Sequence, residues 1–241
     1  MEGFLAVLAP YGEGIVTALH GIGMTLGVTA GAIILGMVIG LIMALGKLSK
    51  FKIARWPASV YVEIIRGTPL FVQVLILAYG VPYLVSTISD GTVRFNWQPL
   101  YLVGILACGF NSGAYLAEII RSGIQAVDRG QTEAARSLGM TNGQNMRYIV
   151  LPQALKIILP AMANEFVTLI KETSILSYVG IVEITRQGVL WASRDFATFP
   201  AYIGVAVVYL CLTIPLSRVV AYLEKRMGSA GPSMKKRKAG M

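Results

Sequence analysis

The chain has 241 residues, of which 55% are hydrophobic and 14% are charged, and its mean hydropathy is +0.66. Soluble domains carry about 25% charged residues, so this composition excludes an ordinary soluble protein and indicates a multi-pass protein of the cell membrane. The formal net charge is +9. Because the basic residues cluster beside apolar runs, they indicate membrane topology and not nucleic-acid binding.

The N-terminal third predicts a lead-in segment and two membrane spans. Residues 1–21 hold acidic but no basic residues, which does not fit a cleaved signal peptide, and we expect an extracytoplasmic or interfacial segment there. Residues 22–45 are uncharged and exceed the roughly 20 apolar residues that cross a bilayer. A second span is predicted over residues 69–85, directly after the sequence VEIIRGTPL.

Three further spans are predicted, over residues 100–116, 157–181 and 199–223. The expected fold is therefore an all-α membrane protein with about five transmembrane helices, whose transmembrane domain covers residues 22–226. The tail, residues 227–241, is rich in Gly, Ser and basic residues and is expected to be disordered. It is read as a solvated charge run, with contact to anionic headgroups as the alternative.

An odd number of spans places the two termini on opposite sides of the membrane. The segments after the first span, after the third span and at the C-terminus hold 17 of the 21 basic residues. The positive-inside rule then predicts an extracytoplasmic N-terminus, with the tail and the segment between the third and fourth spans in the cytoplasm.

That cytoplasmic segment, residues 133–152, reads EAARSLGMTNGQNMRYIVLP. Its first residues favour a helix, Gly139 permits a tight turn, and residues 140–150 can form a second short helix. Pro152 is expected to mark the return toward the fourth span, since a proline interrupts a helix. The segment predicts a helix-turn-helix on the cytoplasmic face, or alternatively an amphipathic surface helix without a partner.

The spacing of Glu133-Ala134-Ala135, Gly139, Ile149, Leu151 and Pro152 resembles the EAA signature of permease subunits of ATP-binding-cassette (ABC) importers. In that family the segment is the coupling helix, which docks on an ATPase subunit. The resemblance implies a type I importer fold, and it implies that Glu133 and Arg136 meet charged ATPase residues while Gly139 makes the turn. The coupling residues that it assigns are Glu133, Ala134, Ala135, Arg136, Ser137, Leu138, Gly139 and Met140.

Four other blocks resemble the polar amino-acid subfamily of these permeases, which includes carriers of histidine, arginine, lysine, glutamine and glutamate. They are VYVEIIRGTPLFVQ, residues 111–131, residues 163–174 and ITRQ at 184–187, and the resemblance covers residues 20–225. It implies two ATPase subunits, a second permease chain, identical or similar, and an extracytoplasmic amino-acid-binding protein or domain. Within VYVEIIRGTPLFVQ, a local Glu63–Arg66 ion pair is an alternative explanation for both residues.

The chain itself lacks the phosphate-binding loop GxxxxGK[ST]. We therefore expect no enzymatic activity, no metal and no cofactor in this chain, with ATP and magnesium bound by the partner subunits.

Ionisable residues within spans are costly and usually face a cavity or a partner. An amino acid needs a cation for its carboxylate and carboxylates or amide oxygens for its ammonium group. By helical periodicity Glu165 falls near Glu172. The candidate substrate-binding residues are Thr68, Asn111, Tyr115, Glu118, Asn164, Glu165, Lys171 and Glu172.

Two alternatives remain at this point. Lys171–Glu172 and Glu118–Arg121 can instead be ion-pair networks that hold the bundle together. The charges of the fourth span can also form the ion or proton path of a secondary transporter, although no internal repeat divides these five spans into halves.

Overall fold

The structure, a computed structural model, describes residues 2–227, and these residues are helical with no strand. The predicted tail therefore lies outside the described residues from residue 228 onward. The elements are α1 (Glu2–Leu19), α2 (Ile22–Leu48), α3 (Lys52–Gly67), α4 (Leu70–Leu75), the π-helix η1 (Ile76–Gly80), α5 (Val81–Ile88), α6 (Tyr101–Gln125), α7 (Arg129–Ser137), α8 (Asn142–Asn145), the π-helix η2 (Met146–Val150), α9 (Leu151–Glu172), the 3₁₀-helix η3 (Thr173–Val179), α10 (Ile184–Asp195) and α11 (Thr198–Met227).

Five helical runs among the described residues are long and apolar enough to cross a membrane, which confirms the predicted all-α fold with five spans. Two runs begin earlier than predicted, because α1 leads into α2 and α8 leads through η2 into α9 with little interruption. The five runs are Ala9–Leu48, Leu70–Ile88, Tyr101–Gln125, Asn142–Val179 and Thr198–Met227.

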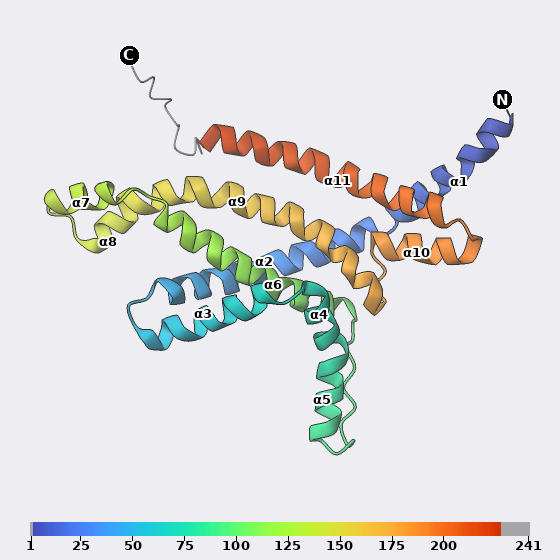
Figure 1. Cartoon of the computed structure of the whole chain (residues 1–241), viewed down its shortest axis with the longest axis horizontal. Helices are drawn as coiled ribbons and strands as arrows, with labels where there is room; N and C mark the ends of the chain where they lie inside the picture. Colours follow the sequence, from blue (N-terminus) through green and yellow to red (C-terminus); the bar gives the residue numbers. More distant parts are fainter. Residues whose placement is uncertain (1, 228–241) are drawn as a thin grey trace, which may run out of the picture.

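The long helices form an elongated bundle (Figure 1). Along it α2 packs on α6, α6 on α9, and α9 on α11, while α1 and α10 pack on α11 at one end. The α7–α8 segment lies at the opposite end, and the arm formed by α4, η1 and α5 projects from the side of the bundle. A cluster of buried side chains from α2, α4, α6 and α9, including Val28, Val74, Val103 and Leu169, forms the main core.

Glycines allow α2 and α6 to approach each other closely. A Cβ atom added at Gly40 would lie 2.7 Å from the Cβ of Leu116, and one at Gly36 would lie 3.2 Å from the backbone nitrogen of Gly113. Small residues at this spacing are the usual way for helices to pack tightly in lipid. These glycines therefore bind two helices of the same chain together.

The boundary between α1 and α2 is also a site of close approach. A side chain at Gly21 would clash with the backbone of Glu183 and Ile184, at the start of α10. The hydroxyl oxygen of Thr25 accepts a hydrogen bond from the amide of Ile184 at 3.3 Å. The segment expected to be an interfacial lead-in is a helix, α1, and the α1–α2 boundary is fixed against α10.

Pro152 does not separate two helices, and this corrects the prediction for residues 140–152. The chain runs from α8 through η2 into α9 without a break, and Leu151 donates its amide to the carbonyl of Met146, five residues earlier. A proline has no N–H to continue an α-helical ladder, and a π-turn just before it widens the backbone so that the helix continues. The arm repeats this arrangement, with η1 directly before Val81 and Pro82.

Candidate functional site

The α7–α8 segment is a helix-turn-helix in which the start of each helix and the end of α7 are capped. The carboxylate of Asp128 accepts the amide of Gly130 at 2.6 Å and so caps the start of α7. Gly139 has a φ of +79°, a left-handed conformation that favours glycine. The amides of Gly139 and Met140 donate to the carbonyls of Arg136 and Ala135 at 2.9 and 3.0 Å, which ends α7 in the manner of a glycine C-cap.

The second helix of this segment begins with a capping box. The Thr141 hydroxyl accepts the amide of Gln144 at 3.3 Å, and the Gln144 side chain accepts the amide of Thr141 at 2.8 Å. Asn145 donates its side-chain amide to the hydroxyl of Thr132 at 3.2 Å and joins α8 to α7. The turn is therefore held in one geometry by its own side chains.

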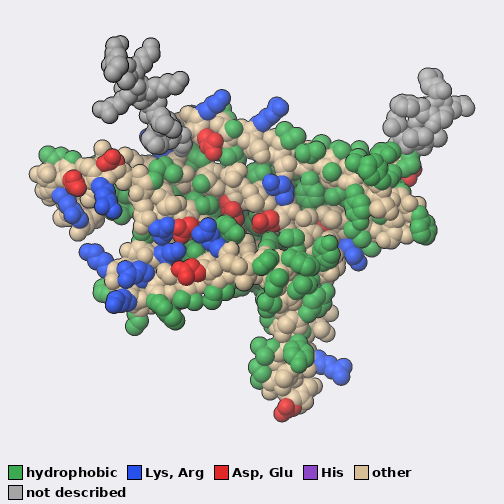
Figure 2. Space-filling model, in the orientation of Figure 1, with side chains coloured by type: hydrophobic (Ala, Val, Ile, Leu, Met, Phe, Trp, Pro, Cys, Tyr) green, Lys and Arg blue, Asp and Glu red, His purple; other side chains and the backbone are tan. Residues whose placement is uncertain are grey.

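One face of this helix-turn-helix is presented outward. Glu133, Ala134, Ser137 and Leu138 are exposed, Leu138 at 83%, whereas Ala135 is buried against the body of the protein. Arg136 is exposed and donates to the side-chain oxygen of Asn142 at 3.2 Å. Figure 2 shows Lys and Arg side chains gathered at this end of the bundle, around α7, α8 and the start of α3.

A strip of polar side chains lies buried between α6 and α9. Asn111 and Ser112 of α6 are buried, as is Glu165 of α9, which is 9% exposed, while Glu172 is half-buried. Glu165 lies beside the Ser112 hydroxyl and close enough to Glu172 to interact with its charge. The Ser112 hydroxyl makes no hydrogen bond of ordinary geometry within residues 2–227. The strip thus retains unused hydrogen-bonding capacity.

The strip extends to the break between α3 and α4. Asn111 donates to the side-chain oxygen of Gln73 at 3.0 Å. The amide of Gln73 in turn donates to the carbonyls of Ile65 and Thr68 at 2.8 and 3.1 Å, and to the Thr68 hydroxyl at 2.9 Å. Thr68 and Pro69 are extended, so the side chain of Gln73 satisfies carbonyls that the helix end leaves unpaired.

Of the predicted set, the structure links Asn111 to the exposed Thr68 through Gln73, and it places Glu165 close to Glu172. It adds Gln73 and Ser112, which were not among the predicted site residues. The only sequence feature that pointed to Gln73 was its place in the block GTPLFVQ. The only one that pointed to Ser112 was its position next to Asn111.

Four predicted site residues are not part of this buried strip. Asn164 and Lys171 are exposed and lie about 100° to 120° around α9 from Glu165. Tyr115 is also exposed, and the guanidinium of Arg66 lies 5.2 Å from its ring centroid. The Glu118 carboxylate accepts a hydrogen bond from Lys47 at 3.0 Å, and both of its oxygens accept hydrogen bonds from Arg121.

These contacts decide two of the alternatives. The Glu118–Arg121 network exists and is enlarged by Lys47, so both oxygens of the Glu118 carboxylate already accept hydrogen bonds. The local Glu63–Arg66 ion pair does not form within residues 2–227, because Arg66 lies over the Tyr115 ring instead.

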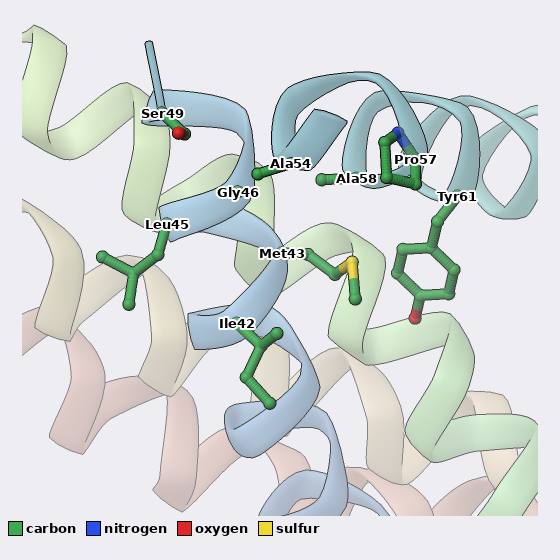
Figure 3. Close-up of a pocket in the computed structure, with 9 residues that line it drawn as sticks. All are labelled: Ile42, Met43, Leu45, Gly46, Ser49, Ala54, Pro57, Ala58 and Tyr61. Carbon is green, nitrogen blue, oxygen red and sulfur yellow. The ribbon is translucent and has the colours of Figure 1, made fainter. Parts of the chain in front are cut away.

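A cavity of about 540 Å³ between the end of α2 and α3 does not suit a charged amino acid (Figure 3). Its lining is apolar apart from Ser49 and Tyr61, and the Tyr61 hydroxyl donates to the carbonyl of Phe110 at 2.5 Å. Burial raises the pKa of Tyr61 to about 12. The cavity therefore offers no charged group to an amino acid.

A second buried carboxylate, Glu183, lies outside the five spans at the start of α10. It is 0% exposed, and its oxygens accept the amides of Thr185 and Arg186 and the hydroxyl of Tyr209, each at 2.8 Å. Burial raises the pKa of this carboxyl above its usual range, although these donors act in the opposite direction. Glu183 caps α10 and ties it to α11.

Five membrane-crossing runs, a buried polar strip between two of them and an exposed, capped helix-turn-helix at one end define a membrane transport subunit. Residues 36–229 match the family model of the binding-protein-dependent transport system inner membrane component, and the chain belongs to this family. The resemblance read from the EAA signature is thereby confirmed.

Relatives and a solved structure agree with this assignment. The chain is 36% identical over 223 residues to a putative glutamine transport system permease protein of Rickettsia prowazekii (strain Madrid E), covering 92% of this chain and 98% of the relative. It is 33% identical over 211 residues to an arginine transport system permease protein of Bacillus subtilis (strain 168), covering 88% and 92%. A chain in the crystal structure of an amino acid ABC transporter with histidines superposes with a TM-score of 0.80 at 43% identity, covering 87% of this chain and 94% of that one.

Proposed function

We propose that this protein is the membrane-spanning permease subunit of an ATP-driven importer for a polar or charged amino acid. The observation that carries the proposal is the α7–α8 segment, in which the EAA signature residues form a capped turn with an exposed face. The amino-acid systems named among its relatives support the substrate class. The rival reading, a secondary transporter, has no comparable support.

The exposed face of α7 is the docking surface for an ATPase subunit. Glu133 and Arg136 offer charges to that partner, and the small side chain of Ala134 allows close approach. ATP and magnesium bind to the ATPase subunits, and this chain catalyses no bond chemistry. The full assembly holds two ATPase subunits, a second permease chain and an extracytoplasmic amino-acid-binding protein or domain.

The basic segments at the α7–α8 end set the orientation. By the positive-inside rule that end faces the cytoplasm and the N-terminus lies outside. The α10 end then faces outward, toward the binding protein.

The buried strip supplies the groups that hold the substrate. The carboxylate of Glu165, with Glu172 behind it, attracts the ammonium group or a cationic side chain. Asn111 and Thr68, held by Gln73, present amide and hydroxyl groups at the α3–α4 break. Lys171, Asn164 and Tyr115 line the exposed side of the same helices, where Lys171 offers a cation to the carboxylate once a second permease chain closes the path.

ATP-dependent uptake tests this function. The complex is reconstituted into vesicles and supplied with labelled glutamine, arginine or histidine together with its binding protein. The proposal expects uptake of at least one of them that requires ATP and persists after ion gradients are collapsed. Uptake that follows a proton or sodium gradient without ATP would support the secondary transporter instead.

A further inference from the structure

A polar cavity lies between the end of α6, α7 and η2, and it carries positive charge. Its volume is about 560 Å³, and Arg129, Thr132 and Arg136 line it from one face of α7. No acidic side chain lines it. Among residues 2–227, neither Arg129 nor Arg136 makes an ion pair with Asp or Glu.

The wall of this cavity is also incompletely hydrogen-bonded. Asn145 is 6% exposed and lines the cavity. Its amide nitrogen donates to Thr132, but its side-chain oxygen has no hydrogen-bond partner within the described part of the chain. The two guanidinium groups can hold an anion. The unpaired oxygen of Asn145 is an acceptor and can receive a hydrogen bond from a hydroxyl of the same ligand.

An apolar groove adjoins the cavity. It has a volume of about 850 Å³, lies between α2, α6 and α9, and shares Ile124 and Met146 with the basic cavity. Apart from Ser49 its lining is aliphatic or Met, and Leu45, Leu155 and Leu159 are substantially exposed. Ile120 and Ile124 of α6, together with Leu155 and Leu159 of α9, belong to membrane-crossing runs, so the groove extends from the basic end toward the lipid.

We propose that the cavity and the groove together form a binding site for an anionic phospholipid. The headgroup phosphate is held between Arg129 and Arg136, and an acyl chain lies in the groove. Basic pockets between helices at the cytoplasmic side of a membrane are the usual sites for such headgroups. An apolar surface of a second permease chain would fill the groove but would leave both guanidinium groups without an anion.

The location of the site suggests what the lipid does. Arg129 and Arg136 belong to α7, whereas the groove belongs to α2, α6 and α9. A lipid bound to both therefore joins the helix-turn-helix to the body of the bundle next to the exposed face of α7, to which Arg136 also belongs.

Native mass spectrometry of the full chain, delipidated in detergent, tests the proposal with phosphatidylglycerol and phosphatidylcholine of identical acyl chains. Wild type is expected to prefer phosphatidylglycerol, and Arg129→Gln with Arg136→Gln is expected to lower that preference about tenfold or more, because both basic groups that face the headgroup phosphate are removed. The matched control, Arg55→Gln with Arg147→Gln, removes two exposed charges that line neither cavity and is expected to keep the preference. Arg129→Lys with Arg136→Lys keeps the charge and is expected to restore most of it.

Four results would overturn the proposal. Two are a wild-type chain without any preference for phosphatidylglycerol and an equal loss in the control variant. Another is displacement of the lipid by glycerol phosphate at a similar concentration, which would identify a site for free anions. The fourth is a lipid-free dimer in which the second chain excludes both lipids.

Discussion

Two buried glutamates of this protein have opposite surroundings. Glu183 is completely enclosed, and two backbone amides and one hydroxyl donate to its carboxylate. Glu165 is almost as buried, but its polar neighbours are Ser112, whose hydroxyl makes no hydrogen bond of ordinary geometry, and Glu172, which carries the same charge. A buried carboxylate that is fully hydrogen-bonded holds helices together, whereas one with a single nearby donor keeps acceptor capacity for a ligand.

The largest expected effect is the loss of stability in Glu183→Ala. The substitution leaves the amides of Thr185 and Arg186 and the hydroxyl of Tyr209 without an acceptor, and each unsatisfied buried donor costs about 1–3 kcal/mol. The free energy of unfolding should therefore fall by about 3 kcal/mol or more. Thermal unfolding in detergent measures it, with Glu165→Ala as the matched control. Equal losses in both variants would remove the distinction between the two carboxylates.

Substitution of Glu165 should affect transport more than it affects stability. Glu165→Gln removes the charge that we assign to the substrate and should lower ATP-dependent uptake by about tenfold, of the size expected when one charge-assisted hydrogen bond is lost. Its unfolding midpoint should match that of wild type. Lys171→Met should lower uptake similarly. Uptake that is unchanged in both variants would end the assignment of this site.

The pH dependence of stability tests the surroundings of Glu183. Because burial raises the pKa of Glu183 in the folded protein, the folded state binds this proton more tightly than the unfolded chain does. Its contribution is fully present below the unfolded pKa of about 4.3 and is lost as the pH rises through the folded pKa. Unfolding midpoints of wild type should fall across that range, and those of Glu183→Gln should fall less. Parallel pH profiles would contradict the prediction.

The smallest expected effect concerns the network of Lys47, Glu118 and Arg121. Lys47→Met leaves Arg121 to pair with Glu118, and partly exposed ion pairs contribute about 1 kcal/mol or less. The unfolding midpoint should change little, and uptake should stay near the wild-type rate. A tenfold loss of uptake at normal stability would return Glu118 to the substrate site.

The number of spans and the helix-turn-helix could be predicted because both follow from local patterns. Apolar runs of sufficient length form helices in lipid. The turn at Gly139 is specified by the glycine and by the capping residues next to it. The continuation of the helix through Pro152 could not be predicted from the sequence. It depends on a π-turn before the proline, and no residue pattern predicts that backbone adjustment.

The site was predictable only in part, because helical periodicity orders residues around one helix but does not say which side faces a neighbour. It grouped Glu165 with Glu172 and Lys171 with Asn164, yet it could not tell that the first pair faces α6 and the second faces outward. Helical periodicity also could not show that Lys47, 71 positions away, pairs with the carboxylate of Glu118. Contacts between distant helices decide such assignments.

The most direct test of the central claim is co-purification of an ATPase subunit with the tagged chain. The compared proteins are wild type, Glu133→Ala with Gly139→Pro, and the control Gly91→Pro. Gly139 and Gly91 both have positive φ values, +79° and +75°, which proline cannot adopt, but only Gly139 lies in the α7–α8 turn. The account predicts that wild type and the control retain the ATPase subunit and that the turn variant loses it while remaining helical. A folded wild-type chain without any ATPase subunit, or equal retention by all three proteins, would contradict it.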